Sequence, residues 1–254
     1  MAFRLTNYPL LTFVITFGLM WASTWVGMYL RRHWRTDPEQ LRDDFGVVLG
    51  ATLTLLGLII GFTFSMATTR YDQRKNLEEE EANAIGTEYV RVDLLPADAA
   101  AKTRTLLIHY TDLRVQFYKA RRGPELDKIN AETSALQTQL WNTVVEPAKS
   151  QPSTNTHLVL SGMNDVLNSQ GYTQAAWWNR IPRAAWSLMF AIAIVSHILL
   201  GYGAHSRSSF LSIVLPLLVS IAFLLIADID SPRGGIIRVQ PQNIQAFADS
   251  LGQH

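Results

Sequence analysis

The side chains best suited to chemistry lie just after the last apolar stretch of the chain. Asp228, Asp230 and Arg233 leave that stretch together, and the glycine pair 234–235 that follows allows unusual backbone angles and exposed amides. The pattern fits an ion-coordinating or gating turn, in which Asp228 or Asp230 pairs with Arg233 or with Arg70 at the end of another apolar stretch. It fits a solvated turn at a membrane surface equally well.

A second gating candidate is His197, the one ionisable side chain deep within an apolar stretch. Ionisable groups in such positions are costly and often functional. A histidine that hydrogen-bonds a carbonyl group of a neighbouring helix is an equally good interpretation. The apolar stretches lack the several carboxylates that coupled transporters use, which argues against proton or sodium coupling.

Small residues recur at helical spacing along the second apolar stretch. They cover one helix face roughly 100° wide and include two pairs of glycines four residues apart, a spacing that lets backbones approach closely. One interpretation is simple helix packing. In the other, copies of this helix surround an axis in an oligomer, and two phenylalanines form an apolar constriction. The pore-lining candidates are Gly50, Thr54, Gly57, Gly61, Phe62, Phe64 and Ser65.

Four consecutive acids, Glu78 to Glu81, follow the second apolar stretch. On a helix, Arg74 would face Glu78 and Lys75 would face Glu79, so the run predicts a solvated helix surface. In a ring of subunits it would instead form an acidic collar that concentrates cations near the axis.

The composition excludes several classes of protein. The chain has no cysteine, which rules out disulfides and thiolate metal sites, and its net charge of +1 argues against a nucleic-acid partner. Its six histidines are scattered, and no hydrolase, phosphate-loop or dinucleotide motif is present. We therefore expect no enzymatic activity, no cofactor and no metal site.

Charge divides the chain into parts that suit two different solvents. Of its 43 Asp, Glu, Lys and Arg residues, 28 lie between Arg70 and Arg183. The remainder contains four stretches long and apolar enough for membrane-spanning helices, which need about 20 residues. These stretches are Leu10–Leu30, Phe45–Thr69, Ala184–Tyr202 and Phe210–Ala227. The sequence predicts an all-α membrane protein with four transmembrane helices and a helical extramembrane domain between the second and the third.

We expect four parts in order along the chain. They are transmembrane helices 1 and 2 in residues 1–69, the extramembrane domain in 70–183, transmembrane helices 3 and 4 in 184–228, and a tail in 229–254. Lys and Arg residues near the spans number eight on the side of the extramembrane domain and five on the other, which favours a cytoplasmic domain. Arg31, Arg32 and Arg35, in the short loop on the opposite side, favour the reverse.

Apolar positions within the extramembrane domain also recur at helical spacing. Residues 71–95 continue the second apolar stretch without a proline, so together they predict one helix of about 50 residues, ended by Pro96. The other expected elements are a helix around 106–117, a helix from Pro124 to Pro147, a loop at 150–156, and a weaker helix around 158–172 that Gly162 and Gly171 interrupt. The expected result is a helical bundle on the membrane.

Two long motifs resemble those of a known family. The first covers 61–75 and continues in 81–91 and 94–96, and the second is the turn at 228–239. Both resemble the signature of the bacterial bestrophin-like domain family. The layout of the chain is similar to that of bestrophins, pentameric anion channels whose second membrane helix lines the pore.

The resemblance implies an oligomeric ion channel in a bacterial inner membrane, a homo-oligomer with five subunits if it follows bestrophins. Phe62 and Phe64 would then correspond to the aromatic constrictions of the pore. The acidic cluster that binds calcium in bestrophins has no counterpart in this sequence, so calcium control is not expected. The other hypothesis is a non-conducting membrane scaffold or signalling protein whose helical domain binds a cytosolic partner.

Overall fold

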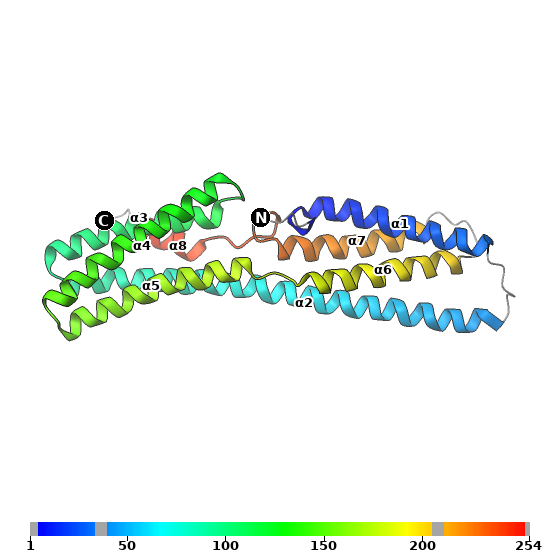
Figure 1. The fold of residues 1–254 in the computed structure, drawn as a ribbon, viewed down its shortest axis with the longest axis horizontal. Coiled ribbons are helices and arrows are strands. Elements are labelled where there is room, and N and C mark those ends of the chain that lie inside the picture. The colour runs from blue at the N-terminus through cyan, green and yellow to red at the C-terminus, as the bar shows by residue number, and fades with distance from the viewer. Residues whose placement is uncertain (1–4, 34–39, 205–210, 252–254) are drawn as a thin grey trace. The chain divides into compact units, whose positions relative to one another are not determined.

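The computed structural model describes residues 5–33, 40–204 and 211–251, and every regular element in these ranges is a helix. The α-helices in Figure 1 are α1 (Pro9–His33), α2 (Gln40–Arg91), α3 (Ala97–Lys119), α4 (Pro124–Ser150), α5 (Thr154–Trp178), α6 (Arg183–Gly203), α7 (Leu211–Asp230) and α8 (Gln242–Leu251). Two short 3-10 turns, η1 (Leu5–Asn7) and η2 (Val92–Leu94), accompany them. The predicted all-α class is confirmed, while Arg35 of the basic loop lies outside the described residues.

The chain divides into two compact units. The first contains residues 1–69 and 180–237, and the second contains residues 70–179 and 238–254. Within the described ranges, four helices are long and apolar enough to cross a membrane, in agreement with the four predicted spans. The helix predicted to continue from the second span is also present, because α2 runs for 52 residues and contributes to both units.

In the first unit α1 packs along α6 and α7. The backbones of α1 and α6 meet at two glycines. A Cβ atom on Gly201 would overlap the carbonyl oxygen of Thr24, and one on Gly27 would overlap the carbonyl oxygen of Ile198. Only residues without a side chain permit this close crossing of two helices.

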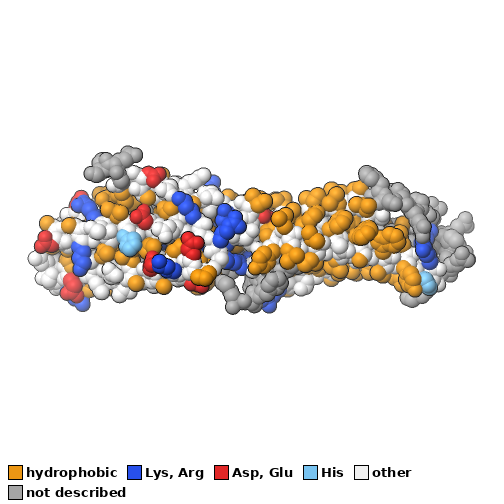
Figure 2. Space-filling view, turned by 90° about the horizontal axis from the view of Figure 1, so that it is seen from above, with side chains coloured by type: hydrophobic (Ala, Val, Ile, Leu, Met, Phe, Trp, Pro, Cys, Tyr) orange, Lys and Arg blue, Asp and Glu red, His pale blue; other side chains and the backbone are white. Residues whose placement is uncertain are grey.

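The surface of the first unit suits hydrocarbon. Figure 2 shows hydrophobic side chains over the visible face of this unit and charged side chains over that of the second. The hydroxyl groups of α1 are satisfied within the helix, since Thr12, Ser23 and Thr24 donate to the carbonyl oxygen four residues earlier at 3.1, 2.8 and 3.0 Å. Internal satisfaction of polar groups is what a bilayer requires, because the hydrocarbon offers no partner.

The second unit is a helical bundle in which α3 packs on α4 and α4 packs on α5. Its core includes Ile85 from α2, Leu107 from α3, Leu140 from α4 and Met163 from α5, all fully buried. Helix α8 closes one side of the bundle, where the ring of Phe247 lies against Gly86 and Tyr89.

Three features of this bundle differ from the prediction. Pro147 does not end α4, which continues to Ser150, because a proline in the last turn removes only one N–H and Gln151 still donates to the Pro147 carbonyl at 2.9 Å. Gly162 and Gly171 do not interrupt α5. Helix α8 has no counterpart among the predicted helices and lies in the segment expected to be a tail.

Candidate functional site

The predicted pore-lining residues lie on a face of α2 that is open within the chain. Gly50, Thr54, Gly57, Gly61 and Ser65 are all exposed. A Cβ atom placed on any of these three glycines would meet no described atom within 4 Å. The two phenylalanines are exposed as well, with Phe62 at 62% and Phe64 at 39%. Simple packing within one chain therefore does not account for this face.

The buried positions of this part of α2 are elsewhere on the helix. Leu56, Thr63 and Ala67 are at most 4% exposed, and their spacing of seven and four residues places them together on one side. Thr63 donates to the Ile59 carbonyl at 2.7 Å, and Thr54 on the open face donates to the Gly50 carbonyl at 2.9 Å. The helix thus has one side buried in the fold and one side exposed, and the hydroxyl groups of Thr54 and Thr63 are bonded within the helix.

The turn after α7 is fixed by Asp228. Its two carboxylate oxygens accept from the backbone N–H groups of Ile236 and Ile237 at 2.8 and 2.7 Å. Glycine is required beside it, because a Cβ atom on Gly235 would overlap the carbonyl oxygen of Asp228 and one on Gly234 would overlap that of Asn7. The sequence 228–237 therefore forms a folded-back turn, and Asp228 is 7% exposed rather than solvated.

Asp230 ties the same turn to the start of α6. One of its oxygens accepts from the Ile181 N–H at 3.0 Å, and the other lies 3.3 Å from Nε of Arg180. Arg180 also donates to the Asp230 carbonyl at 2.8 Å and to the side chain of Asn7. This arginine was not among the predicted partners of Asp230, and the side chains of the pair are 5% and 1% exposed.

Asp228→Asn is expected to lower the free energy of unfolding by about 1–3 kcal/mol, because an amide can accept from only one of the two N–H groups and presents a donor to the other. Thermal unfolding of the purified protein in detergent measures the effect. Asp72→Asn, at an exposed position of α2, is the matched control and should leave the transition unchanged. Equal midpoints for the two variants would contradict the assigned role of Asp228.

The remaining gating candidates are Arg70, His197 and Arg233. Arg70 belongs to the second unit and donates to Oδ1 of Asn179 at 3.1 Å. His197 is fully buried on α6, and its Nδ1 lies 2.7 Å from the carbonyl oxygen of Ala193 in the same helix. Arg233 is 7% exposed. An ion-binding or gating role for these residues stays a prediction.

The acidic run on α2 is not a uniform solvated surface, and that prediction is wrong for two of its members. Glu79 and Glu80 are exposed, but Glu78 and Glu81 are 1% and 0% exposed. Glu81 forms an ion pair with Arg114, which is also fully buried, and accepts from Tyr118 at 2.9 Å and Thr173 at 3.1 Å. These contacts join α2, α3 and α5 through one carboxylate.

Burial and charge shift the pKa values in this cluster. Burial, followed by the negative charge of Glu81, raises the pKa of Tyr118, so its hydroxyl stays protonated and donates. Burial lowers the pKa of Arg114, but the neighbouring Glu81, together with Tyr110 and Tyr118, raises it, and the net shift is upward. The cluster is therefore a charged pair surrounded by neutral donors.

Glu78 holds the start of α8. One carboxylate oxygen accepts from the N–H groups of Asn243 and Ile244 at 2.9 and 3.0 Å, and the other accepts from the Asn243 side chain at 2.7 Å. A carboxylate at this position satisfies helix N–H groups that lack a partner and interacts favourably with the helix dipole. Glu78 is thus a cap for another helix, supplied from α2.

The sequence contains a pattern that identifies these buried acids. Apart from Ala82, the buried residues of this part of α2 and η2 are spaced alternately by four and three positions, at Arg74, Glu78, Glu81, Ile85, Glu88 and Val92. Such spacing marks one face of a helix. Because the apolar members share that face with the acids, the acids could have been assigned to the interior.

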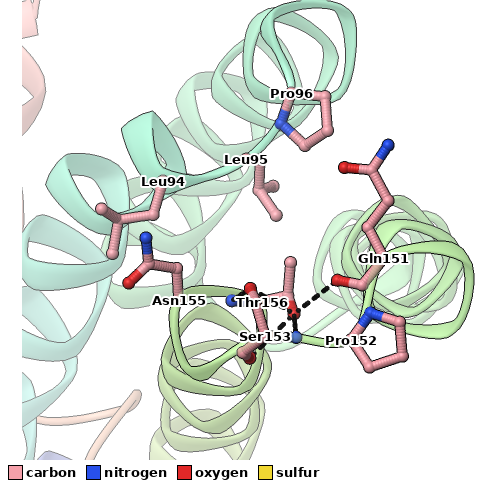
Figure 3. Close-up of a pocket in the computed structure, with 8 residues that line it drawn as sticks. All are labelled: Leu94, Leu95, Pro96, Gln151, Pro152, Ser153, Asn155 and Thr156. Carbon is pink, nitrogen blue, oxygen red and sulfur yellow. Dashed lines mark hydrogen bonds between the residues drawn. The ribbon is translucent and has the colours of Figure 1, made fainter.

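A shallow cavity of about 400 Å³ lies where η2 meets the loop between α4 and α5 (Figure 3). It is lined by Leu94, Leu95, Pro96, Gln151, Pro152, Ser153, Asn155 and Thr156, none of which is charged. Ser153 and Thr156 exchange hydrogen bonds of 3.0 and 3.1 Å that cap α5, so their polar groups are occupied by the fold. Among the described residues, no group of three or more His, Asp or Glu side chains could hold a metal ion.

A comparison with known families identifies the chain. The model of the Bestrophin-like domain matches residues 14–244, which is nearly the whole chain. The protein belongs to the Bestrophin-like family. No curated protein matches it. Together with the four apolar helices, membership makes this Bestrophin-like protein a multi-pass membrane protein.

Solved structures with the same fold include a bacterial bestrophin homologue from Klebsiella pneumoniae. One crystal structure of a single-residue variant aligns with a TM-score of 0.62 and 14% identity over 95% of this chain and 96% of that chain. Another variant aligns with a TM-score of 0.64 and 16% identity over 95% and 94% of the two chains. The Bestrophin-like fold of this chain is therefore shared at low sequence identity.

Proposed function

We propose that this Bestrophin-like protein is an oligomeric ion channel in which α2 lines the pore. The observation that carries the proposal is the open glycine face of α2, on which a Cβ atom added to Gly50, Gly57 or Gly61 would meet no described atom of the rest of the chain within 4 Å. A face of glycines and small side chains allows several copies of the helix to approach a common axis while a bore remains between them.

Phe62 and Phe64 supply the narrow part of the proposed pore. Their rings are exposed in the single chain and follow directly after the glycine face. Apolar rings around an axis obstruct ions because water leaves a narrow apolar passage. The proposal places the second unit in the cytoplasm, the four spans in the bacterial inner membrane and several copies of the chain in one homo-oligomer, and its activity is the passage of ions rather than catalysis.

The test is ion flux across liposomes that contain the purified protein. Phe62→Ala is expected to raise the flux about tenfold, which corresponds to about 1.4 kcal/mol removed from the barrier. Trp25→Ala is the matched control, because Trp25 is a ring of similar exposure, 53%, on α1. It should leave the flux unchanged.

Two results would overturn the proposal. Vesicles that stay impermeable to every anion and cation tested, under gradients and under voltage, would exclude a channel and leave the scaffold hypothesis. A chain that runs as a monomer on mass photometry in nanodiscs would exclude a pore formed between copies of α2.

A further inference from the structure

Glu88 is a buried acid without a hydrogen-bond partner among the described residues. Its side chain is 0% exposed, and neither carboxylate oxygen has a hydrogen-bond partner among the described residues. Glu78 and Glu81, on the same face of α2, each accept several hydrogen bonds. A carboxylate that is buried and unpaired is strongly disfavoured, so this environment favours the neutral, protonated acid.

The space for Glu88 is provided by a glycine on α5. A Cβ atom on Gly162 would overlap Oε2 of Glu88 and would lie 2.6 Å from Nη1 of Arg91. The carboxyl group is therefore pressed against the backbone of α5. This explains why α5 carries a glycine at the position where the sequence suggested an interruption.

Two charged groups act on Glu88, one from each helix of this contact. Arg91, one turn further along α2, lowers the pKa of Glu88, and Asp165 on α5 raises it. Arg91 is near enough to receive the carboxylate but forms no ion pair with it among the described residues. Burial is the largest effect and, against the attraction of Arg91, raises the pKa of Glu88 from 4.5 to about 8.

We propose that Glu88 is a proton-controlled latch between α2 and α5 of the second unit. With the proton bound, the neutral carboxyl group remains against Gly162 and the two helices stay packed. When the proton passes to water, the carboxylate leaves the contact toward Arg91 and solvent, and α5 loosens from α2. The proposal concerns the second unit alone and does not depend on ion conduction.

The direction of the pH dependence follows from the raised pKa of Glu88. The folded unit holds this proton more tightly than the unfolded chain does. The stability that the bound proton contributes is therefore complete below about pH 4.5 and is lost as the pH rises to about 8. The packing of α5 should therefore weaken at alkaline pH. Local opening of α5 is expected to increase on the order of tenfold to a hundredfold between about pH 6 and about pH 9.

Hydrogen exchange of residues 158–166 in the full-length protein, corrected for the intrinsic pH dependence of exchange, tests the latch. The wild type should lose protection with rising pH, whereas Glu88→Gln, which keeps the shape and cannot ionise, should not. Glu80→Gln, at an exposed position on the same helix, is the control and should behave like the wild type. Identical pH profiles for Glu88→Gln and the wild type would overturn the proposal.

A second measurement reports the proton directly. Infrared spectra at about pH 7 should contain the C=O stretching band of a protonated carboxyl group, and Glu88→Gln should remove that band while Glu80→Gln retains it. A band that both variants retain, or that the wild type lacks at this pH, would show that Glu88 is already ionised and would exclude the latch.

Discussion

Glu81→Gln is expected to destabilise the second unit by about 3–5 kcal/mol. Arg114 is fully buried, and the carboxylate of Glu81 is its ion-pair partner. Glutamine keeps the size of the side chain but removes the negative charge, which leaves a buried guanidinium uncompensated. For a unit of this size the unfolding midpoint should fall on the order of 10 °C.

The control for this prediction is Glu80→Gln, because Glu80 is the adjacent residue, is exposed and has the same chemistry. Thermal unfolding and limited proteolysis of α3 and α4 measure both variants. The double replacement Glu81→Leu with Arg114→Met should recover much of the lost stability, since it removes both charges from the interior. A double variant as unstable as Glu81→Gln would show that shape, rather than the buried charge, causes the loss.

Gly201→Ala should destabilise the first unit by about 3 kcal/mol or more, at or above the upper end of the usual cost of overpacking. The added methyl group would meet the backbone carbonyl of Thr24, which cannot move aside as a flexible side chain can. The helices α1 and α6 would have to separate, and the many contacts along them would weaken together.

Gly57→Ala is the matched comparison on α2. The same methyl group enters open space at this position, and alanine favours a helix over glycine by about 1 kcal/mol. Yield and thermal unfolding in detergent should therefore be unchanged or slightly improved, while ion flux should fall if α2 surrounds a pore. Equal losses of stability in the two variants would contradict the assignment of one glycine to packing and the other to an open face.

The membrane helices could be predicted from the sequence because hydrocarbon imposes a simple rule of length and polarity. The starts and ends of α1, α6 and α7 follow that rule within a few residues. The 52-residue length of α2 was also predictable, because no proline interrupts it. Helix α8 follows Pro241 and places Ile244 and Phe247 three residues apart, a pattern too short to separate from a tail without its partner surface.

The polar interactions were predicted less well, since they depend on residues distant in sequence. Nothing local indicates that Arg180 would be the cation beside Asp230, 50 residues away. Nothing near Gly162 indicates that its missing side chain accommodates Glu88 from another helix. The alternation of four and three residues from Arg74 to Val92 indicated burial, but a glutamate on that face could be assigned a partner only from the fold.

The capping of α8 by Glu78 also sets an order for biosynthesis. The second unit is assembled from residues 70–179 and from residues 238–254, and α6 and α7 lie between the two segments in the chain. A ribosome therefore delivers α8 only after both later spans have been synthesised. Until then Glu78 lacks the N–H groups of Asn243 and Ile244, and the core beside Gly86 lacks Phe247. The bundle thus reaches its final form only in chains whose last membrane helices are complete. Maturation of the second unit therefore requires that synthesis of the first unit is finished.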